Sequence, residues 1–347
     1  MQDANSDMTR KINNSYLLGQ SNAPTTGADM LKIRTDGTLV WEEVDGTGYL
    51  PPTWNGGRGL VGGGNSGAGT LASIDYIAIA SLSNASDFGD LYTARENKGA
   101  LSNGSRGVWA GGEYDRTIEY VTISTLSDST DFGDLTAEFV TPRYDVKGCC
   151  NGTRGLWQAG RYAVADSPIC YITVASTGDA INFGDLLVDK QGAAALGDAT
   201  RACFGGGQSG TSPVVRALGI DYVAYDTTGD AADFGDITVA RPKLNGMSDT
   251  TRGIFSDGEA GNTSISTIDY ITIQSTGNAT NFGDRTAVDM YASGDCSNGT
   301  RGVMMGGTGD AGGANVMDYI TIQTTSNAID FGDLTGTRGY SGACAGD

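Results

Sequence analysis

The side chains that most often carry out catalysis or bind metals are scarce in this chain. It contains no histidine, which removes the commonest general base near neutral pH, every Ser-His or Cys-His nucleophile pair and every histidine-containing metal site. Its six cysteines have no Cys-x-x-Cys spacing and fall within predicted strands, so we expect small buried side chains rather than disulfides or metal ligands. These features exclude most hydrolase mechanisms, and we predict that the protein is not an enzyme.

The Asp-Phe-Gly tripeptide is the next candidate for chemistry, because protein kinases bind metal through it. It occurs four times, beginning at Asp87, Asp131, Asp233 and Asp330. No glycine-rich phosphate loop, strand lysine or catalytic loop accompanies it, so the phrase is predicted to be a turn. Stretches such as 230–236 cluster three oxygen-bearing side chains that could bind Ca²⁺, but they lack the ligand number and spacing of known calcium loops. We favour Asp and Asn side chains that cap their own turns, and expect no cofactor.

These phrases belong to a repeat that spans most of the chain. Six copies of Phe-Gly-Asp have phenylalanines 44, 51, 51, 48 and 49 residues apart: Phe88, Phe132, Phe183, Phe234, Phe282 and Phe331. An internal period of about 40–50 residues with several short strands is typical of propeller blades. We therefore predict an all-β fold, with a six-bladed β-propeller in residues 51–347 and a separate segment in residues 1–50.

Each repeat divides into four predicted strands, for example 106–111, 118–124, 132–139 and 144–150. Adjacent apolar residues in the strand that begins with Arg-Gly point to opposite faces, so both faces must be covered by neighbouring blades. After the last Phe-Gly-Asp the next Asn-Gly-Thr-Arg-like phrase is missing, and residues 55–58 supply it at the other end of the chain. We expect the N- and C-terminal strands to share one blade and so close the ring.

Two sets of charged residues recur from repeat to repeat. Acids begin one strand in five repeats, at Asp75, Glu119, Asp221, Asp269 and Asp318. Bases follow the next strand, at Arg95, Arg143, Lys190, Arg241 and Arg338. An antiparallel hairpin brings these positions together, so we expect cross-strand ion pairs within blades; a ring of bases that captures an anion is the alternative. The arginines that open each Arg-Gly strand are predicted to form a structural network.

Differences between repeats concentrate in the loops that follow the Arg-Gly strands, at 113–117, 161–168, 208–219, 259–267 and 308–316. Loops on a rigid scaffold are where recognition is usually built. Aromatic and basic residues suited to stacking on sugar rings occur on this face: Tyr114, Arg161, Tyr162, Tyr144, Arg216 and Tyr291. We predict that they bind a saccharide, and the alternative is that these loops are simply solvated.

The repeat resembles the kelch-type propeller in three features. A base precedes the inner strand (Pro142-Arg143, Arg241), a glycine pair follows the next strand (Gly111-Gly112, Gly306-Gly307), and a tyrosine lies in the third (Tyr120, Tyr270). The aromatic residue of the kelch fourth strand is here phenylalanine instead of tryptophan. The phrases at 268–273 and 278–284 are also similar to propeller-repeat proteins of marine bacteriophages that serve as tail fibres or other virion structural proteins.

That resemblance implies a bacteriophage virion appendage whose propeller recognises host-surface glycan. The alternative is a purely structural virion or surface-filament subunit. It also implies synthesis in the host cytoplasm, a place outside the cell in the finished particle, and a multimeric assembly.

The net charge and the N-terminal segment limit the partners that we expect. A net charge of −19 and a pI near 4.2 oppose binding to nucleic acid, and no apolar run has signal-peptide or transmembrane length, so no membrane insertion is expected. Residues 31–34 and 39–42 flank an Asp-Gly turn and predict a hairpin, which is marginal alone. We expect residues 1–50 to attach the propeller to other virion proteins.

Overall fold

The computed structural model describes residues 29–33, 39–43, 56–112, 115–136, 145–158, 167–209, 214–261, 263–286, 291–309 and 312–346. The chain divides into two compact units, Met1–Leu50 and Pro51–Asp347. In the first unit, β1 (Asp29–Ile33) pairs antiparallel with β2 (Leu39–Glu43), which is the predicted hairpin. Its predicted Asp-Gly turn lies outside the described residues. No helix among the described residues is long and apolar enough to cross a membrane.

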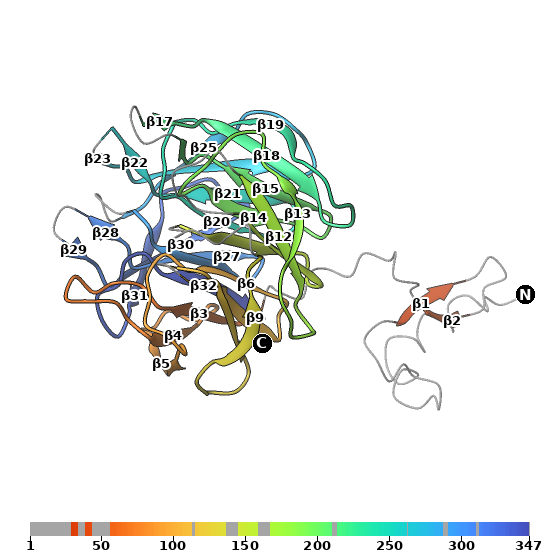
Figure 1. Ribbon diagram of the computed structural model, residues 1–347, viewed down its shortest axis with the longest axis horizontal. Coiled ribbons are helices and arrows are strands. Elements are labelled where there is room, and N and C mark those ends of the chain that lie inside the picture. The colour runs from red at the N-terminus through yellow and green to blue at the C-terminus, as the bar shows by residue number, and fades with distance from the viewer. Residues whose placement is uncertain are drawn as a thin grey trace, which may run out of the picture. The chain divides into compact units, whose positions relative to one another are not determined.

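The second unit is a propeller of six blades, each a four-stranded antiparallel sheet, which confirms the predicted all-β fold (Figure 1). From the axis outward, blade 1 contains β32 (Gly342–Gly346), β3 (Arg58–Gly62), β4 (Ser73–Ala78) and β5 (Ser86–Asp90). Blade 2 contains β6 (Gly99–Ser102), β7 (Arg106–Ala110), β8 (Thr117–Thr122) and β9 (Thr130–Asp134). Blade 3 contains β10 (Lys147–Cys150), β11 (Arg154–Gln158), β12 (Pro168–Thr173) and β13 (Ile181–Asp185).

The remaining blades also carry small hairpins beyond their second strands. Blade 4 contains β14 (Ala194–Gly197), β15 (Arg201–Gly205), β18 (Gly219–Ala224) and β19 (Ala232–Asp236), with β16 (Gln208–Ser209) paired to β17 (Val215–Arg216). Blade 5 contains β20 (Asn245–Ser248), β21 (Arg252–Ser256), β24 (Thr267–Thr272) and β25 (Thr280–Asp284), with β22 (Glu259–Ala260) paired to β23 (Thr263–Ser264). Blade 6 contains β26 (Gly294–Ser297), β27 (Arg301–Met305), β30 (Val316–Thr321) and β31 (Ile329–Asp333), with β28 (Thr308–Gly309) paired to β29 (Gly312–Gly313).

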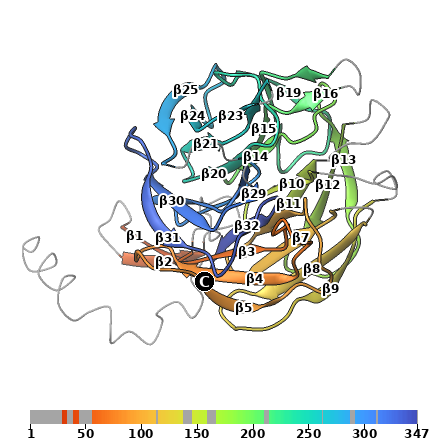
Figure 2. The ribbon, with the colours of Figure 1, turned by 90° about the vertical axis from the view of Figure 1, so that its left-hand side faces the viewer.

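The ring is closed by a blade that both ends of the propeller sequence share. Strand β32 pairs antiparallel with β3, with Leu60 opposite Cys344, as predicted. Each innermost strand contacts the innermost strands of both neighbouring blades, so the six of them surround the axis (Figure 2). The inner strand predicted at 144–150 is shorter than expected: β10 begins at Lys147 and belongs to the blade that follows the repeat.

The described residues form six hydrophobic cores, which lie between blades because the second strand of each blade is buried on both faces. In β7, Val108 packs in the core shared with blade 3, and Trp109 packs in the core shared with blade 1. Both side chains are fully buried. Burying a large apolar side chain contributes about 1.5–3 kcal/mol, so each blade depends on both neighbours for its stability.

The recurring arginines form the predicted structural network. Their guanidinium groups lie 4.2 to 5.0 Å from the centre of a tyrosine ring in the same blade, and their Nη1 atoms donate to a carbonyl of the next blade. Each tyrosine in turn packs edge-on against the phenylalanine of Phe-Gly-Asp, with ring centres 5.8 to 6.1 Å apart. The six residues are Arg58, Arg106, Arg154, Arg201, Arg252 and Arg301.

The Phe-Gly-Asp phrase also joins neighbouring blades. In blade 4 the N–H of Asp236 donates to the side-chain oxygen of Asn278 in blade 5, at 3.1 Å. Gly235 permits that approach, because a Cβ there would lie 2.4 Å from the Gly277 carbonyl oxygen. The same hydrogen bond recurs in all six blades, so these Asp and Asn side chains bond the preceding blade. The Phe-Gly-Asp phrase itself ends the outermost strand and is not the turn that was predicted.

We predict that Gly235→Ala destabilises the propeller by about 1–3 kcal/mol, the usual range for forcing extra atoms into a packed site. Gly229→Ala is the matched control, because Gly229 has a similar φ of 156° against 143° for Gly235, but a Cβ there would meet nothing within 4 Å. Urea unfolding should give a lower midpoint for Gly235→Ala than for Gly229→Ala. Equal midpoints would show that the blade contact is unimportant.

Candidate functional site

The five recurring acids are paired with bases, but the partners expected for them within their own blades are wrong. Arg338 pairs with Asp75 at 3.3 Å, Lys190 with Asp221 at 2.9 Å and Arg241 with Asp269 at 2.9 Å. Each base therefore comes from the connection that leads into the blade, not from the one that leaves it, because that connection turns toward the axis before the base occurs.

In two blades the base also changes position. Lys98, rather than Arg95, pairs with Glu119, while Arg95 contacts Asp115. In blade 6 Arg285 bonds Asp318 through Nε at 2.9 Å. Arg143 lies outside the described residues. The bases that pair with the five acids are buried: Lys98, Lys190, Arg241, Arg285 and Arg338. These bases are therefore not available to an anionic ligand, which opposes the anion-capturing alternative.

Of the six residues predicted to bind a saccharide, four lie outside the described residues: Tyr114, Tyr144, Arg161 and Tyr162. The structure brings the other two, Arg216 and Tyr291, into one cluster through side chains that the sequence analysis did not select. Arg216 Nη2 lies 3.6 Å from Glu259 Oε1, and Lys243 Nζ lies 2.9 Å from Glu259 Oε2. Lys243 Nζ also lies 4.2 Å from the centre of the Tyr291 ring.

Tyr340 completes this cluster. Its ring packs edge-on against Tyr291, with centres 6.0 Å apart, and lies 5.9 Å from Lys243 Nζ. Burial, the hydrogen bond with Tyr291 and the carboxylates of Asp145 and Glu96 raise the pKa of Tyr340. Its hydroxyl therefore stays protonated.

Tyr340 and Lys243 belong to a ring of six residues, one before each innermost strand, which we call the mouth ring. Its members all have left-handed backbone conformation, with φ between 55° and 64°: Asn97, Asp145, Gly192, Lys243, Ala292 and Tyr340. Backbone hydrogen bonds link successive members, from Asn97 N to Tyr340 O at 2.8 Å and from Tyr340 N to Ala292 O at 2.7 Å. A left-handed conformation costs a residue with a side chain about 1–2 kcal/mol, so five of the six blades keep a side chain at this ring despite strain that glycine would avoid.

The variable loops lie beside the mouth ring. Backbone bridges join Gln191 to Gln208 in blade 4 and Tyr291 to Thr308 in blade 6. Figure 2 views the propeller from the side on which the hairpins β22–β23 and β28–β29 lie. This face therefore combines a mouth of six unlike residues with loops that differ between blades, whereas the arginine and Phe-Gly-Asp networks repeat identically.

Below the mouth ring the axis holds a small polar chamber of about 30 Å³. Its polar lining residues are Lys98, Lys147, Asn245, Asp295 and Ser341. The chamber continues into a cavity of about 80 Å³ lined mainly by glycine, alanine, serine and cysteine side chains of the innermost strands. Lys147 Nζ donates to Asn245 Oδ1 at 2.5 Å across the chamber. Burial lowers the pKa of Lys147. The carboxylates of Asp145, Asp295 and Asp257 raise it and so offset part of this effect.

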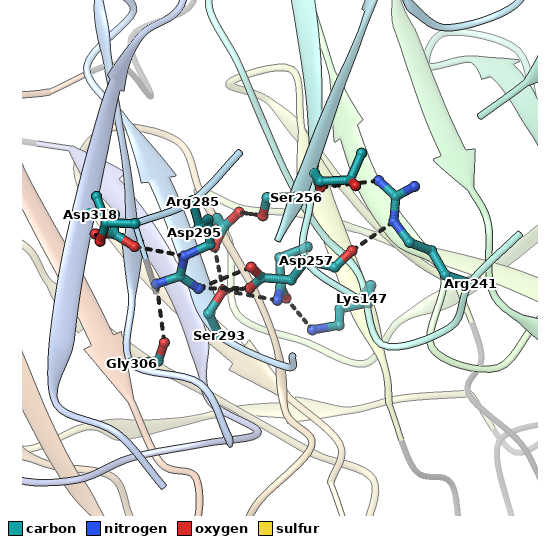
Figure 3. Close-up of polar contacts among 12 residues, drawn as sticks. Lys147, Arg241, Ser256, Asp257, Arg285, Ser293, Asp295, Gly306 and Asp318 are labelled. Carbon is teal, nitrogen blue, oxygen red and sulfur yellow. Dashed lines mark hydrogen bonds and ion pairs between the residues drawn. The ribbon is translucent and has the colours of Figure 1, made fainter. Parts of the chain in front are cut away.

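Three charged residues at the junction of blades 5 and 6 break the repeat together (Figure 3). Asp257 stands where the glycine pair begins in four other blades, Arg285 where other blades carry a buried Leu or Ile, and Asp295 where they carry Ala or Gly. Arg285 Nη1 lies 3.0 Å from both carboxylate oxygens of Asp257, and its Nε binds Asp318. Arg285 and Asp257 compensate each other, because either charge would be costly to bury without the other.

Asp295 is the carboxyl group in this network that holds a proton to a higher pH than an ordinary aspartate, because its pKa is raised. Ser293 Oγ lies within hydrogen-bond distance of both Asp257 and Asp295, at 2.8 Å from Asp295 Oδ1, yet a hydroxyl has only one hydrogen. A neutral Asp295 that donates to Ser293, which then donates to Asp257, satisfies all three groups. Burial and the charge of Asp257 raise the pKa of Asp295 to about 7, against the opposing effect of Ser256 and Arg285.

The cysteines behave as small buried side chains, as predicted. All six are free and buried within the described residues. Burial raises the pKa of Cys149 to about 12, so its thiol stays protonated and unreactive. Among the residues that the structure describes, no cluster of three or more Cys, Asp or Glu side chains could hold a metal ion.

Three buried polar atoms at the mouth have no hydrogen-bond partner within the described part of the chain: Gln191 Oε1, Arg216 Nε and Ser341 Oγ. Buried polar groups are normally hydrogen-bonded, so unsatisfied ones near a surface opening mark a place for a ligand or ordered water. The first accepts, the second donates, and the hydroxyl does both. A molecule that carries many hydroxyl groups can satisfy all three.

Sequence reasoning missed Lys243, Glu259 and Tyr340, although a signal for them existed. When the repeats are aligned on the innermost strand, the residue two positions before that strand differs from blade to blade. The strands themselves consist mainly of small residues. The same alignment isolates Lys147 and Asp295, which occupy positions that are mostly glycine or alanine in the other blades.

Two comparisons with known proteins give no assignment. No protein-family model matches the chain, and no curated protein matches it.

We predict that Asp295 makes stability depend on pH. The folded protein keeps a proton on Asp295 that the unfolded chain releases, so the free energy of unfolding should fall as pH rises from about 4 toward 7, by up to about 1.4 kcal/mol per unit. Asp295→Asn should flatten this slope, because it cannot titrate but can still donate to Ser293. Urea unfolding at a series of pH values measures both slopes, and identical slopes would refute the assignment.

Proposed function

We propose that the propeller is a non-enzymatic binding module that holds a saccharide at the mouth ring. The observation that carries this proposal is the combination of unpartnered donors and acceptors with a pair of tyrosines at one asymmetric opening of the described structure. Hydroxyl groups of a sugar both donate and accept, which suits the mixture of Gln191 Oε1, Arg216 Nε and Ser341 Oγ. Tyrosine rings supply apolar surface for the C–H faces of a sugar and a hydroxyl for its edges.

The rigid scaffold supports the same conclusion. Each blade is fixed by both neighbours, so the mouth is preformed, and preformed sites avoid the entropy of ordering loops on binding. A monomeric ring binds a single asymmetric ligand best where its blades differ. In this propeller they differ at the mouth ring and at the loops beside it.

In its biological setting, the module is proposed to be part of a bacteriophage virion appendage, such as a tail fibre, that recognises a host-surface glycan. The support is the resemblance of the repeat to kelch-type propellers and to phage virion proteins, carried by Phe-Gly-Asp, the glycine pairs and the Ile-Asp-Tyr phrases. Residues 1–50 would attach the propeller to other virion proteins, and the particle would carry several copies outside the cell.

The purely structural alternative, a virion or filament subunit without a ligand of its own, has one observation in its favour. Several large apolar side chains are exposed on the propeller, including Leu187 and Val188. Exposed apolar groups in proximity suit protein contacts better than sugar contacts.

Saccharide binding is tested by a glycan array followed by calorimetry with the full chain. Tyr291→Ala should weaken binding about fivefold to thirtyfold, because loss of one stacking ring removes roughly 1–2 kcal/mol. Tyr92→Ala is the control, since Tyr92 is 74% exposed on the outer edge of blade 1 and lies outside the mouth cluster. Failure to bind any surface glycan, or equal loss in both variants, would reject the proposal.

Attachment is tested by removing residues 1–50. We predict that the remaining chain keeps its melting temperature and any glycan binding, because the propeller closes on itself through β32 and β3. It should fail to join the assembled particle, measured by co-sedimentation with virions. Unfolding of the shortened chain, or unchanged incorporation, would contradict this role.

A further inference from the structure

Five large apolar side chains are exposed on two adjoining segments where blade 3 leads into blade 4, and we call them the apolar patch. Leu187 and Val188 are 52% and 53% exposed in the connection after β13. Val214, Val215 and Leu218 are 42%, 57% and 42% exposed, around the hairpin β16–β17 and before β18.

Hydrogen bonds hold the two segments side by side. The N–H of Leu187 donates to Asp221 Oδ2 at 3.2 Å, and Lys190 Nζ donates to the Gly219 carbonyl at 2.7 Å. The connection from blade 3 therefore runs along the start of β18, next to Leu218. The patch belongs to two blades that the scaffold fixes rigidly.

The repeat shows that Leu187 is not required by the fold. At this position the other blades carry threonine in four cases and Tyr92 in one. Where threonine is present, its hydroxyl can bond the acid of the next blade, as Thr238 Oγ1 does with Asp269 Oδ1 at 2.6 Å and Thr335 Oγ1 with Asp75 at 2.8 Å. Leu187 forgoes that hydrogen bond and exposes an apolar side chain in its place.

Leu218 and Val215 depart from the repeat in the same direction. The positions equivalent to Leu218 carry Ala72, Arg116, Ser167, Ser266 and Asn315. The positions equivalent to Val215 carry Thr263 in blade 5 and Gly312 in blade 6. Blades that share one architecture do without these apolar groups, so the patch serves something other than folding.

The charges beside the patch are acidic. Asp185 and Asp189 flank Leu187 in the chain, and Asp236 is paired in register with Gly219, next to Leu218. The neighbouring base Arg216 faces Glu259 at 3.6 Å, and Lys190 is buried against Asp221. The chain as a whole carries a net charge of −19. A second acidic surface would be repelled here, whereas a basic one would be attracted.

We propose that the apolar patch is a docking surface for another protein that presents an apolar segment flanked by lysines and arginines. The apolar side chains exclude water at the centre of the contact, and the acidic rim selects a basic partner. The five patch residues are different from those proposed to contact the saccharide.

The test uses the full chain and a pair of double variants. Leu187→Thr with Leu218→Ser restores residues that other blades carry at these positions. Ile181→Thr with Ile329→Thr is the matched control, because these isoleucines are 57% and 55% exposed outside the patch and align with Thr130 and Thr280. The probe is a synthetic amphipathic peptide of leucine and lysine, compared with its leucine–glutamate counterpart by fluorescence anisotropy.

We expect the basic peptide to bind the native chain and the control variant alike, and the patch variant at least about tenfold more weakly. The melting temperature of the patch variant should be unchanged or higher, because the threonine introduced by Leu187→Thr can bond Asp221 as its equivalents do, so weaker binding cannot be ascribed to unfolding. Equal binding to the patch variant, or equal binding of the acidic peptide, would overturn the proposal. Self-association of the native chain in sedimentation experiments, lost in the patch variant, would also overturn it in favour of a second copy.

Discussion

Closure of the ring is the constraint on which the rest of the propeller depends. The second strand of every blade is apolar on both faces, so no blade can end the array without exposing a hydrophobic face. Pairing of β32 with β3 removes that end, because the last strand of the sequence completes the first blade. The arginine and Phe-Gly-Asp networks then connect each blade to the next around the whole circle, with no terminal member among the six described blades.

Closure also explains which positions can differ from one repeat to another. Side chains that face a neighbouring blade are held to the repeat, whereas residues of the mouth ring contact their neighbours mainly through backbone hydrogen bonds. Their side chains can therefore differ in every blade without loss of the ring. The junction of blades 5 and 6 is the exception that supports this rule, since Asp257, Arg285 and Asp295 depart from the repeat inside the structure and do so together.

The fold could be predicted from the sequence because the six copies of Phe-Gly-Asp give the number of blades. The Asn-Gly-Thr-Arg-like phrase that is missing after the last copy, and is supplied by residues 55–58, indicates how the ring closes. The candidate site could be predicted only in part. Arg216 and Tyr291 stand out by residue type on variable loops, but the cluster that joins them depends on Lys243 and Tyr340, which share nothing in sequence with Asn97 or Ala292. What these positions share is a left-handed backbone at one place in the ring, and no residue type encodes that. The partners of the buried acids were misassigned for a similar reason, because spacing along a hairpin does not say toward which blade a connection turns.

The shared blade has a mechanical consequence. Strand β3 begins where β32 ends, with Arg58 opposite Gly346, so a load pulling residues 56 and 346 apart would separate the two strands one pair at a time, like a zipper. A load that pulls residue 56 away from the mouth ring acts along the length of β3, because β3 runs from that residue toward the mouth. Strand β3 also lies between β32 and β4 and is hydrogen-bonded to both. Both rows of hydrogen bonds then resist together along their length. The pairing of β32 with β3 is therefore weak when the two strands are pulled apart at their free ends, and strong when the molecule is stretched from one face to the other.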